Sequence, residues 1–600
     1  MTYICKDTRN LENMICDAFS RLRTLRRGNH GGVGRCAGAR KMPATASAAG
    51  DSASRPQSLA FKARRASGPR LLLALLMTAA MMISSPNHAS AQPLTRAQVA
   101  QGAVQGAEKN GIGVFLAVPF AEEPSGSLRW KAPVPKAPWE GVFDATKPGP
   151  MPPQLTRRRP GRPAPYVSED CLYVNILTPA RSVDDRLPVL VWIHGGGFIT
   201  GDANSNDGTR FAQDGIVFVS LSYRTGALGF LSLPSLSAEN ERHVSGNYGL
   251  LDMIEGLKWV RDNIEAFGGD PEKVTIMGES AGAIAVSMLC ASPLAKGLFR
   301  GAISESGGSF CPVDSVRNDN NSIRDVRGSE RFGLEFMERI GASSLEGLRA
   351  MSWEAWVGDD LSTGVGGFWP AVDGYVLPDD QYKLYLSGAY NDVNVLAGTN
   401  SDEGAMFCQA IPLAEYEAGV RASYGPFAER MLELYPATDD ESTFGALSDI
   451  FRETAFAWPT WAWATLQGKT GKGKFFMYYF DQFDPERPLF GGPGAPRPRG
   501  ANHATEMQYV FATPWMPFTE GDEAVSKAMH AYWVNFIKHG DPNGEGLDRW
   551  PEYRDGTGSV MLFKDGTGLI ETPHKPQLLL LEEYFEWRRN IRYNCLNLPR

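Results

Sequence analysis

Short apolar runs alternate with helix-like segments through the middle of the chain. Five runs have the length and the Val, Ile and Leu content of buried strands, at residues 187–193, 217–221, 274–277, 301–306 and 393–397. Residues 250–260 and 281–289 have the composition of packed helices. This alternation predicts an α/β fold in which a central, mostly parallel sheet is flanked by helices. Loops at the carboxyl ends of the strands would then form the functional site.

Two further stretches are rich in helical patterns, at about residues 310–390 and 405–500. We predict that these helical insertions cap the sheet and wall an active-site gorge. Because the candidate catalytic residues described below are spread from Ser280 to His503, we predict one large domain with long insertions. The sequence shows no internal repeat.

The apolar run at residues 274–277 leads into Gly278-Glu279-Ser280-Ala281-Gly282, and a helix-like segment follows. This setting predicts that Ser280 occupies a sharp strand-to-helix turn, with strained backbone geometry and an exposed hydroxyl. The N-terminus of the following helix favours negative charge nearby. Ser280 is therefore the candidate nucleophile, and the flanking strand and helix distinguish the motif from a chance match.

A glycine loop, His194-Gly195-Gly196-Gly197-Phe198, follows the run at residues 187–193. Acyl transfer requires N–H donors aimed at an oxyanion, and glycine presents its N–H without a Cβ in the way. We predict the amides of Gly196, Gly197 and Ala281 as these donors. The alternative is an ordinary glycine turn after a strand.

A serine nucleophile needs a base, and four histidines follow Ser280. His530 and His539 fall in or at the end of a helical pattern, where packing or capping explains them, and His574 lies in a Pro-flanked segment. His503 lies in the glycine-led loop 500–504, where a side chain can be presented rather than buried. We predict that His503 is the base.

The acid should lie between the serine and the histidine in chain order. The segment Gly398-Thr399-Asn400-Ser401-Asp402-Glu403-Gly404 directly follows the apolar run at residues 393–397. From the residues alone, Asp402 and Glu403 are both candidates.

Further motifs occur in a characteristic order. They are Val118-Pro119-Phe120-Ala121-Glu122, Ser168-Glu169-Asp170-Cys171, Ser222-Tyr223-Arg224, Gly246-Asn247-Tyr248-Gly249, Gly268-Gly269-Asp270-Pro271 and Gly540-Asp541-Pro542-Asn543. With them the chain resembles the type-B carboxylesterases of the cholinesterase/carboxylesterase family, in the α/β-hydrolase superfamily. The resemblance runs from about residue 95 to near the C-terminus.

The resemblance implies a serine carboxylesterase with a Ser280, His503 and Glu403 triad and an acyl-enzyme intermediate. It favours Glu403 because the acid of this family is usually the glutamate of Asp-Glu-Gly, which leaves Asp402 a structural hydrogen-bonding role. It also implies that Glu506 supports the site from behind. We expect a small-molecule ester as substrate, with no cofactor and no metal. The alternatives are a catalytically silent binding or adhesion module, and an acyltransferase or lactonase that uses the same site.

The sequence also offers candidates for the substrate pocket. Phe198, Phe368 and Trp369 are candidates to line the substrate pocket, and the alternative for each is core packing. Cholinesterases bind a quaternary ammonium through a tryptophan upstream of the Ser-Glu-Asp-Cys motif, and residues 157–167 contain none. An arginine-rich loop, Arg157 to Arg162, occupies that stretch. We therefore expect neutral or carboxylate-bearing esters to be preferred over choline esters.

Residues 1–91 differ from the rest. The apolar run at residues 71–83 is short for a membrane span, and Ala89-Ser90-Ala91 has the pattern of a signal cleavage site. We predict an N-terminal extension and signal peptide at 1–91, cleavage after Ala91, and an esterase domain at 92–600 that is secreted or periplasmic. The alternative is a short membrane anchor; after removal of the signal we expect no stable membrane insertion.

Charge and cysteine content bear on nucleic-acid binding and on disulfides. The chain has 60 Lys and Arg, of which 14 lie in residues 1–91, and 68 Asp and Glu, of which 4 lie there. Residues 92–600 therefore carry 46 basic and 64 acidic residues, a formal net charge of −18. Such an acidic domain is not expected to bind nucleic acid. Five of the eight cysteines lie after residue 91, so at least one should be free. The sequence predicts no particular disulfide and no oligomeric state.

Overall fold

The computed structural model describes residues 92–156, 165–315, 322–360, 367–486, 498–554 and 558–596, with only the backbone described at 359–360 and from 591 on. The predicted signal peptide and the arginines of the loop Arg157 to Arg162 lie outside these residues. Among the cysteines whose side chains are described, Cys171, Cys290 and Cys408 form no disulfide. The expectation of at least one free thiol is therefore confirmed.

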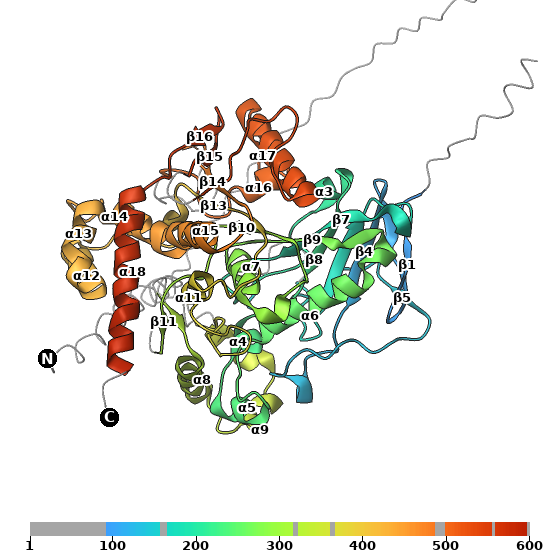
Figure 1. Ribbon diagram of the computed structural model, residues 1–600. Helices are drawn as coiled ribbons and strands as arrows, with labels where there is room; N and C mark the ends of the chain where they lie inside the picture. Colours follow the sequence, from blue (N-terminus) through green and yellow to red (C-terminus); the bar gives the residue numbers. More distant parts are fainter. Residues whose placement is uncertain are drawn as a thin grey trace, which may run out of the picture. The chain divides into compact units, whose positions relative to one another are not determined.

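An 11-stranded mixed sheet crosses the described part of the chain (Figure 1). Seven neighbouring strands, from β15 to β8, are parallel, and antiparallel strands extend the sheet at both edges. In spatial order the strands are β16 (Gly568–Ile570), β15 (Val560–Phe563), β14 (Phe475–Phe480), β13 (Asn394–Asn400), β10 (Gly301–Glu305), β9 (Gly269–Glu279), β7 (Leu187–Ile193), β8 (Val217–Leu221), β6 (Tyr173–Thr178), β4 (Ile112–Pro119) and β3 (Ala107–Lys109). Two small sheets contain β1 (Arg96–Val99), β2 (Gly102–Gln105) and β5 (Val142–Asp144), and β11 (Val313–Asp314) with β12 (Ile323–Arg324).

Both faces of the sheet are buried, as the continuous apolar runs predicted. Along β7, Val189 and Val191 belong to one hydrophobic core, whereas Leu190 and Trp192 belong to a second core on the opposite face. Helices α6 (Tyr248–Asn263) and α7 (Ala281–Ala291) pack in the first core. Residues of α3 (Thr209–Gln213), α16 (Met507–Val510) and α17 (Glu520–His539) pack in the second. Figure 1 shows these two groups of helices on opposite sides of the sheet, which confirms the predicted α/β architecture.

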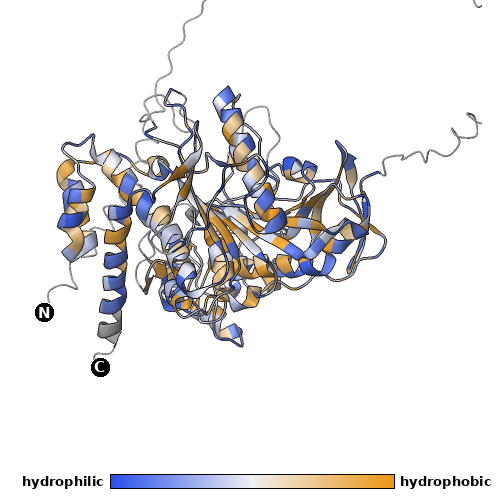
Figure 2. Ribbon diagram, turned by 45° about the horizontal axis from the view of Figure 1, so that its top comes forward, coloured by the Kyte–Doolittle hydropathy of each residue, from blue (hydrophilic) through white to orange (hydrophobic). Residues whose placement is uncertain are grey.

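The remaining helices lie in the insertions and at the C-terminal end. They are α4 (Gly226–Phe230), α5 (Pro234–Glu239), α8 (Val326–Ile340), α9 (Leu345–Ala350), α10 (Val357–Asp360), α11 (Gln381–Leu386), α12 (Leu413–Tyr424), α13 (Ala428–Leu434), α14 (Thr443–Arg452), α15 (Trp458–Thr470) and α18 (Lys575–Leu596). Figure 2 shows apolar residues along the strands of the interior, while the surrounding helices carry both apolar and polar residues. No helix among the described residues is long and apolar enough to span a bilayer.

Local sequence signals set several boundaries. Helix α17 begins with a capping box between Thr519 and Asp522 and ends at His539, before Gly540, whose φ of 69° is left-handed. Between α14 and α15 the chain forms a π-helical turn, Glu453–Ala457. Such turns are rare and often occur at functional sites, and this one lies next to the candidate base.

Candidate active site

Ser280 lies between the end of β9 and the start of α7. Its φ of 55° and ψ of −125° confirm the strained turn predicted from the motif. Glycines permit this turn, because a Cβ on Gly278 would lie 2.4 Å from the carbonyl carbon of Gly282, and a Cβ on Gly282 would lie 2.1 Å from the oxygen of Ile193. The serine hydroxyl is thereby held at the carboxyl edge of the sheet, ahead of the first turn of a helix.

The glycine loop after β7 runs beside this turn. A Cβ on Gly195 would lie 3.1 Å from the Cβ of Ser280 and 2.7 Å from the oxygen of Glu279. Gly196 and Gly197 have φ values of 106° and 65°, which glycine adopts without strain. Only a loop without side chains could approach the serine this closely.

Glu403 and His503 meet although they lie 100 residues apart in the chain. His503 Nδ1 is 2.6 Å from Glu403 Oε2. Glu403 Oε1 accepts hydrogen bonds from Ser306 Oγ at 2.6 Å and from the Asn400 amide at 2.7 Å. Because Glu403 is fully buried and both oxygens are bonded, its carboxylate is fixed relative to the imidazole.

The second ring nitrogen of His503 faces the serine turn. His503 Nε2 lies 3.2 Å from Oε1 of Glu279, the residue directly before Ser280. Within the described residues, the Ser280 hydroxyl forms no hydrogen bond of its own. The contact of His503 with Glu279 is one between charges without a hydrogen bond, because Glu279 Oε1 has no hydrogen-bond partner among the described residues.

The expectation that the loop presents His503 rather than burying it is wrong, because the residue is only 4% exposed. Phe456, from the π-helical turn, stacks on the imidazole with ring centroids 4.7 Å apart. Phe407 makes an edge contact at 5.2 Å and itself stacks on Phe451. These rings come from segments distant in sequence, so a loop motif alone could not reveal the covering.

Three buried glutamates act on the charge of this histidine: Glu279, Glu403 and Glu506. Burial alone would lower the pKa of His503, but the charges of Glu279 and Glu403 outweigh it and raise that pKa to about 9. Burial raises the pKa of Glu279 to about 7 and, together with Glu279 and Glu403, that of Glu506 to about 8. The cluster therefore favours a protonated imidazole, the species formed when a base accepts a proton from serine.

Glu506 reaches the site through Asn400. The Asn400 side-chain amide donates to Glu506 Oε2, while the Asn400 backbone amide donates to Glu403. Glu506 thus lies behind the acid and is linked to it by one shared residue. Glu305, at the end of β10, accepts a 2.6 Å hydrogen bond from Trp533 Nε1, and burial and Glu506 raise its pKa well above the usual range.

The pocket candidates lie in different surroundings. Phe198 is fully buried, with edge contacts at 5.2 Å to both Phe230 and the half-buried Trp369. Phe368 is 1% exposed and packs on Phe332 and Phe336 of α8. Their roles in substrate binding stay predictions.

The other histidines after Ser280 either have partners elsewhere or lie on the surface. His530 is buried, with Nδ1 2.6 Å from the Val510 oxygen and Nε2 2.9 Å from Asp214. His539 is exposed at the last position of α17, and the half-buried His574 lies beside Arg452 and Tyr479.

Sequence reasoning did not assign roles to Ser306, Asn400, Phe407 or Phe456. Ser306 directly follows β10, the strand between the serine strand β9 and the acid strand β13. Because the carboxyl ends of adjacent parallel strands meet at one edge, that position was a detectable signal for Ser306. Phe407 and Phe456 offered no comparable signal, since aromatic residues are common in cores of this size.

Comparisons with known proteins identify the family and the fold. The model of the carboxylesterase family matches residues 93–578. A fumonisin B1 esterase of Sphingopyxis macrogoltabida is 35% identical over 498 residues, covering 79% of this chain and 88% of that protein. A para-nitrobenzyl esterase of Bacillus subtilis is 34% identical, covering 77% and 93%. A solved structure titled PNB esterase is 32% identical, with a TM-score of 0.69 over 81% of this chain and 99% of the other.

The fold is therefore that of the α/β hydrolases, and the chain belongs to the carboxylesterase family. It is a carboxylic ester hydrolase whose substrates are small-molecule esters.

Proposed function

We propose that the enzyme hydrolyses esters through a Ser280, His503 and Glu403 triad. The contact that supports this most directly is the 2.6 Å pair between His503 and Glu403, made by two loops distant in sequence and placed beside the strained serine turn. Ser280 Oγ attacks the ester carbonyl while His503 accepts its proton. The negative charge of Glu403 orients the imidazole and stabilises the imidazolium that forms.

The amides of Gly196, Gly197 and Ala281 are proposed to bind the oxyanion. None of these three N–H groups has an acceptor elsewhere in the described chain, and Ala281 is the first residue of α7. Donors already in place at the carbonyl oxygen stabilise the charge that develops on it without reorganisation. The intermediate collapses as the alcohol takes the proton from His503, and water then hydrolyses the acyl-enzyme by the same steps.

A fluorescent organophosphonate tests this assignment, because it phosphonylates an activated serine and remains bound. We expect one label per molecule, on the tryptic peptide that contains Ser280, and loss of ester hydrolysis in proportion to labelling. Labelling of another serine with full loss of hydrolysis would disprove the proposed nucleophile.

The pKa of His503 predicts an unusual pH profile. Because neutral imidazole is the base, kcat/KM should rise with pH through the pKa of His503, which Glu279 and Glu403 hold above its ordinary value. Replacing Glu279 by glutamine removes one of these charges, so the pKa should fall. We expect the acid limb of kcat/KM to move to lower pH by about one unit or more, and the plateau to fall because the imidazolium is less stabilised.

The measurement is kcat/KM for a chromogenic ester from pH 5 to 10. Glu429→Gln is the matched control, since Glu429 is exposed and, among the residues that the structure describes, pairs only with Arg421. An acid limb that stays in place in Glu279→Gln, or that moves equally in the control, would show that Glu279 does not set the pKa of the base.

We also propose that the mature enzyme begins at Gln92 and is secreted or periplasmic. The apolar run at residues 71–83 and the Ala89-Ser90-Ala91 pattern support this.

A further inference from the structure

The loops that carry Glu403 and His503 are joined to each other just before those residues. The Asp402 amide donates to the Ala501 oxygen at 2.9 Å, and the Ala501 amide donates to Ser401 Oγ at 2.8 Å. A Cβ on Gly500 would lie 2.3 Å from Ser401 Oγ, so glycine is required for this approach. The pairing of these two short backbone segments therefore sets the distance between the acid and the base.

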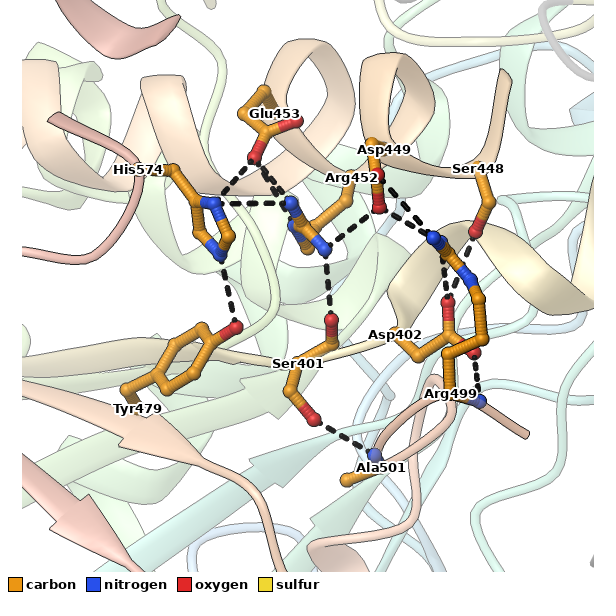
Figure 3. Close-up of polar contacts among 10 residues, drawn as sticks. All are labelled: Ser401, Asp402, Ser448, Asp449, Arg452, Glu453, Tyr479, Arg499, Ala501 and His574. Atoms are coloured by element: carbon orange, nitrogen blue, oxygen red, sulfur yellow. Dashed lines mark hydrogen bonds and ion pairs between the residues drawn. The ribbon is translucent and has the colours of Figure 1, made fainter. Parts of the chain in front are cut away.

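Helix α14 lies over the paired loops and bonds to the acid loop. Ser448 Oγ donates to Asp402 Oδ1 at 3.0 Å, and Arg452 Nη1 donates to the Ser401 oxygen at 2.9 Å (Figure 3). The same helix continues into the π-helical turn that stacks Phe456 on His503. One continuous helical segment thus contacts both the acid loop and the imidazole.

Arg499, in the segment before His503, connects that segment to the acid loop and to helix α14. Its backbone amide donates to Asp402 Oδ2 at 3.0 Å, and its guanidinium Nη2 lies 3.2 Å from Asp402 Oδ1 and 2.7 Å from Asp449 Oδ1 on α14 (Figure 3). The Asp402 side chain is 1% exposed, whereas that of Arg499 is 40% exposed. A buried carboxylate in the acid loop is therefore satisfied largely by the residue four positions before the catalytic base.

Sub-ångström placement matters for a triad, because a shift of about 1 Å caused by a remote change can lower a rate about 100-fold. No other ion pair in the described chain joins the acid loop to the segment before His503. Asp402 and Arg499 are thus placed to fix the distance between Glu403 and His503 without touching the reacting atoms.

We propose that Asp402 and Arg499 are positioning residues, a clamp that sets the alignment of Glu403 and His503 for proton transfer. This rests on the triad proposed above, and it gives Asp402 a role distinct from that of the acid. The clamp acts on the chemical step rather than on substrate binding, so its loss should lower kcat and leave KM nearly unchanged.

The test compares Asp402→Asn, Arg499→Gln and the double variant. For each, the organophosphonate gives both the fraction of molecules that can be labelled and the rate constant of phosphonylation. We expect the labelled fraction to stay at the wild-type level while the rate constant and kcat fall by about 10- to 100-fold in each single variant. The double variant should lose no more than the worse single variant, because both changes break one interaction.

Arg430→Gln is the matched control. Its pair with Glu583 also links two helices, but both side chains are more than half exposed, so no change in rate is expected. Unchanged rate constants in both single variants, losses that multiply in the double variant, or an equal loss in the control would overturn the clamp. So would a fall in labelled fraction that accounts for the whole loss of activity.

Two outcomes separate this proposal from the assignment of the triad. If wild-type enzyme is not labelled at Ser280, the proposed triad fails. If wild type is labelled and the variants react at its rate, only the clamp fails. Should Asp402→Asn not fold, Arg499→Gln decides alone, because its side chain is partly exposed.

Discussion

Replacing Ser280 with alanine should lower kcat/KM by about four to six orders of magnitude while the protein remains folded. The hydroxyl is the only group that alanine removes, and within the described residues it makes no hydrogen bond that the fold needs. His503→Ala should have a comparable effect, and the double variant should be no worse than either single one, because the two residues act as a unit.

The measurement is kcat/KM with a chromogenic ester, accompanied by the thermal unfolding midpoint of each variant. Ser387→Ala is a suitable control because Ser387 is an exposed residue at the end of α11. More than about a tenth of wild-type activity in Ser280→Ala would exclude Ser280 as the nucleophile, since triad loss removes most of the acceleration.

Replacing Glu403 with glutamine should lower kcat by about three to four orders of magnitude. Glutamine keeps the shape of the side chain but lacks the negative charge 2.6 Å from His503 Nδ1. The imidazolium then loses its main partner, and an amide N–H turned toward Nδ1 would favour the wrong tautomer.

Asp402→Asn should cost far less, in the range expected for the clamp, because the Asp402 carboxylate is bonded to Arg499 and Ser448 rather than to the imidazole. The two variants are matched, since each removes one buried carboxylate from adjacent positions. A larger loss in Asp402→Asn than in Glu403→Gln would move the role of the acid to Asp402.

The sequence was sufficient to predict strands of the central sheet and the turn at Ser280. Strands β7 and β8 occur at the predicted residues 187–193 and 217–221, because each is a continuous apolar run buried on both faces. The strained turn at Ser280 follows from local order as well, since a strand, small residues and a helix leave one backbone path. These features depend on neighbours in the chain.

The choice between Asp402 and Glu403 was different. From the residues both remained candidates, and the resemblance to a family favoured Glu403. In the structure Glu403 faces His503 and Asp402 faces Arg499. The two adjacent carboxylates have the same chemistry, and only the distant residue that each one contacts distinguishes their roles.

What the sequence by itself determined is therefore the sheet, the serine turn, the glycine loop and the set of candidate residues. Tertiary structure alone decided the burial of His503 beneath Phe456, the glutamate cluster that raises its pKa, and the link between the two loops through Arg499. The physical reason is the range of the interactions. Backbone conformation and hydrophobic periodicity depend on residues close together in the chain, whereas desolvation and charge interaction depend on side chains that the fold brings together from distant segments.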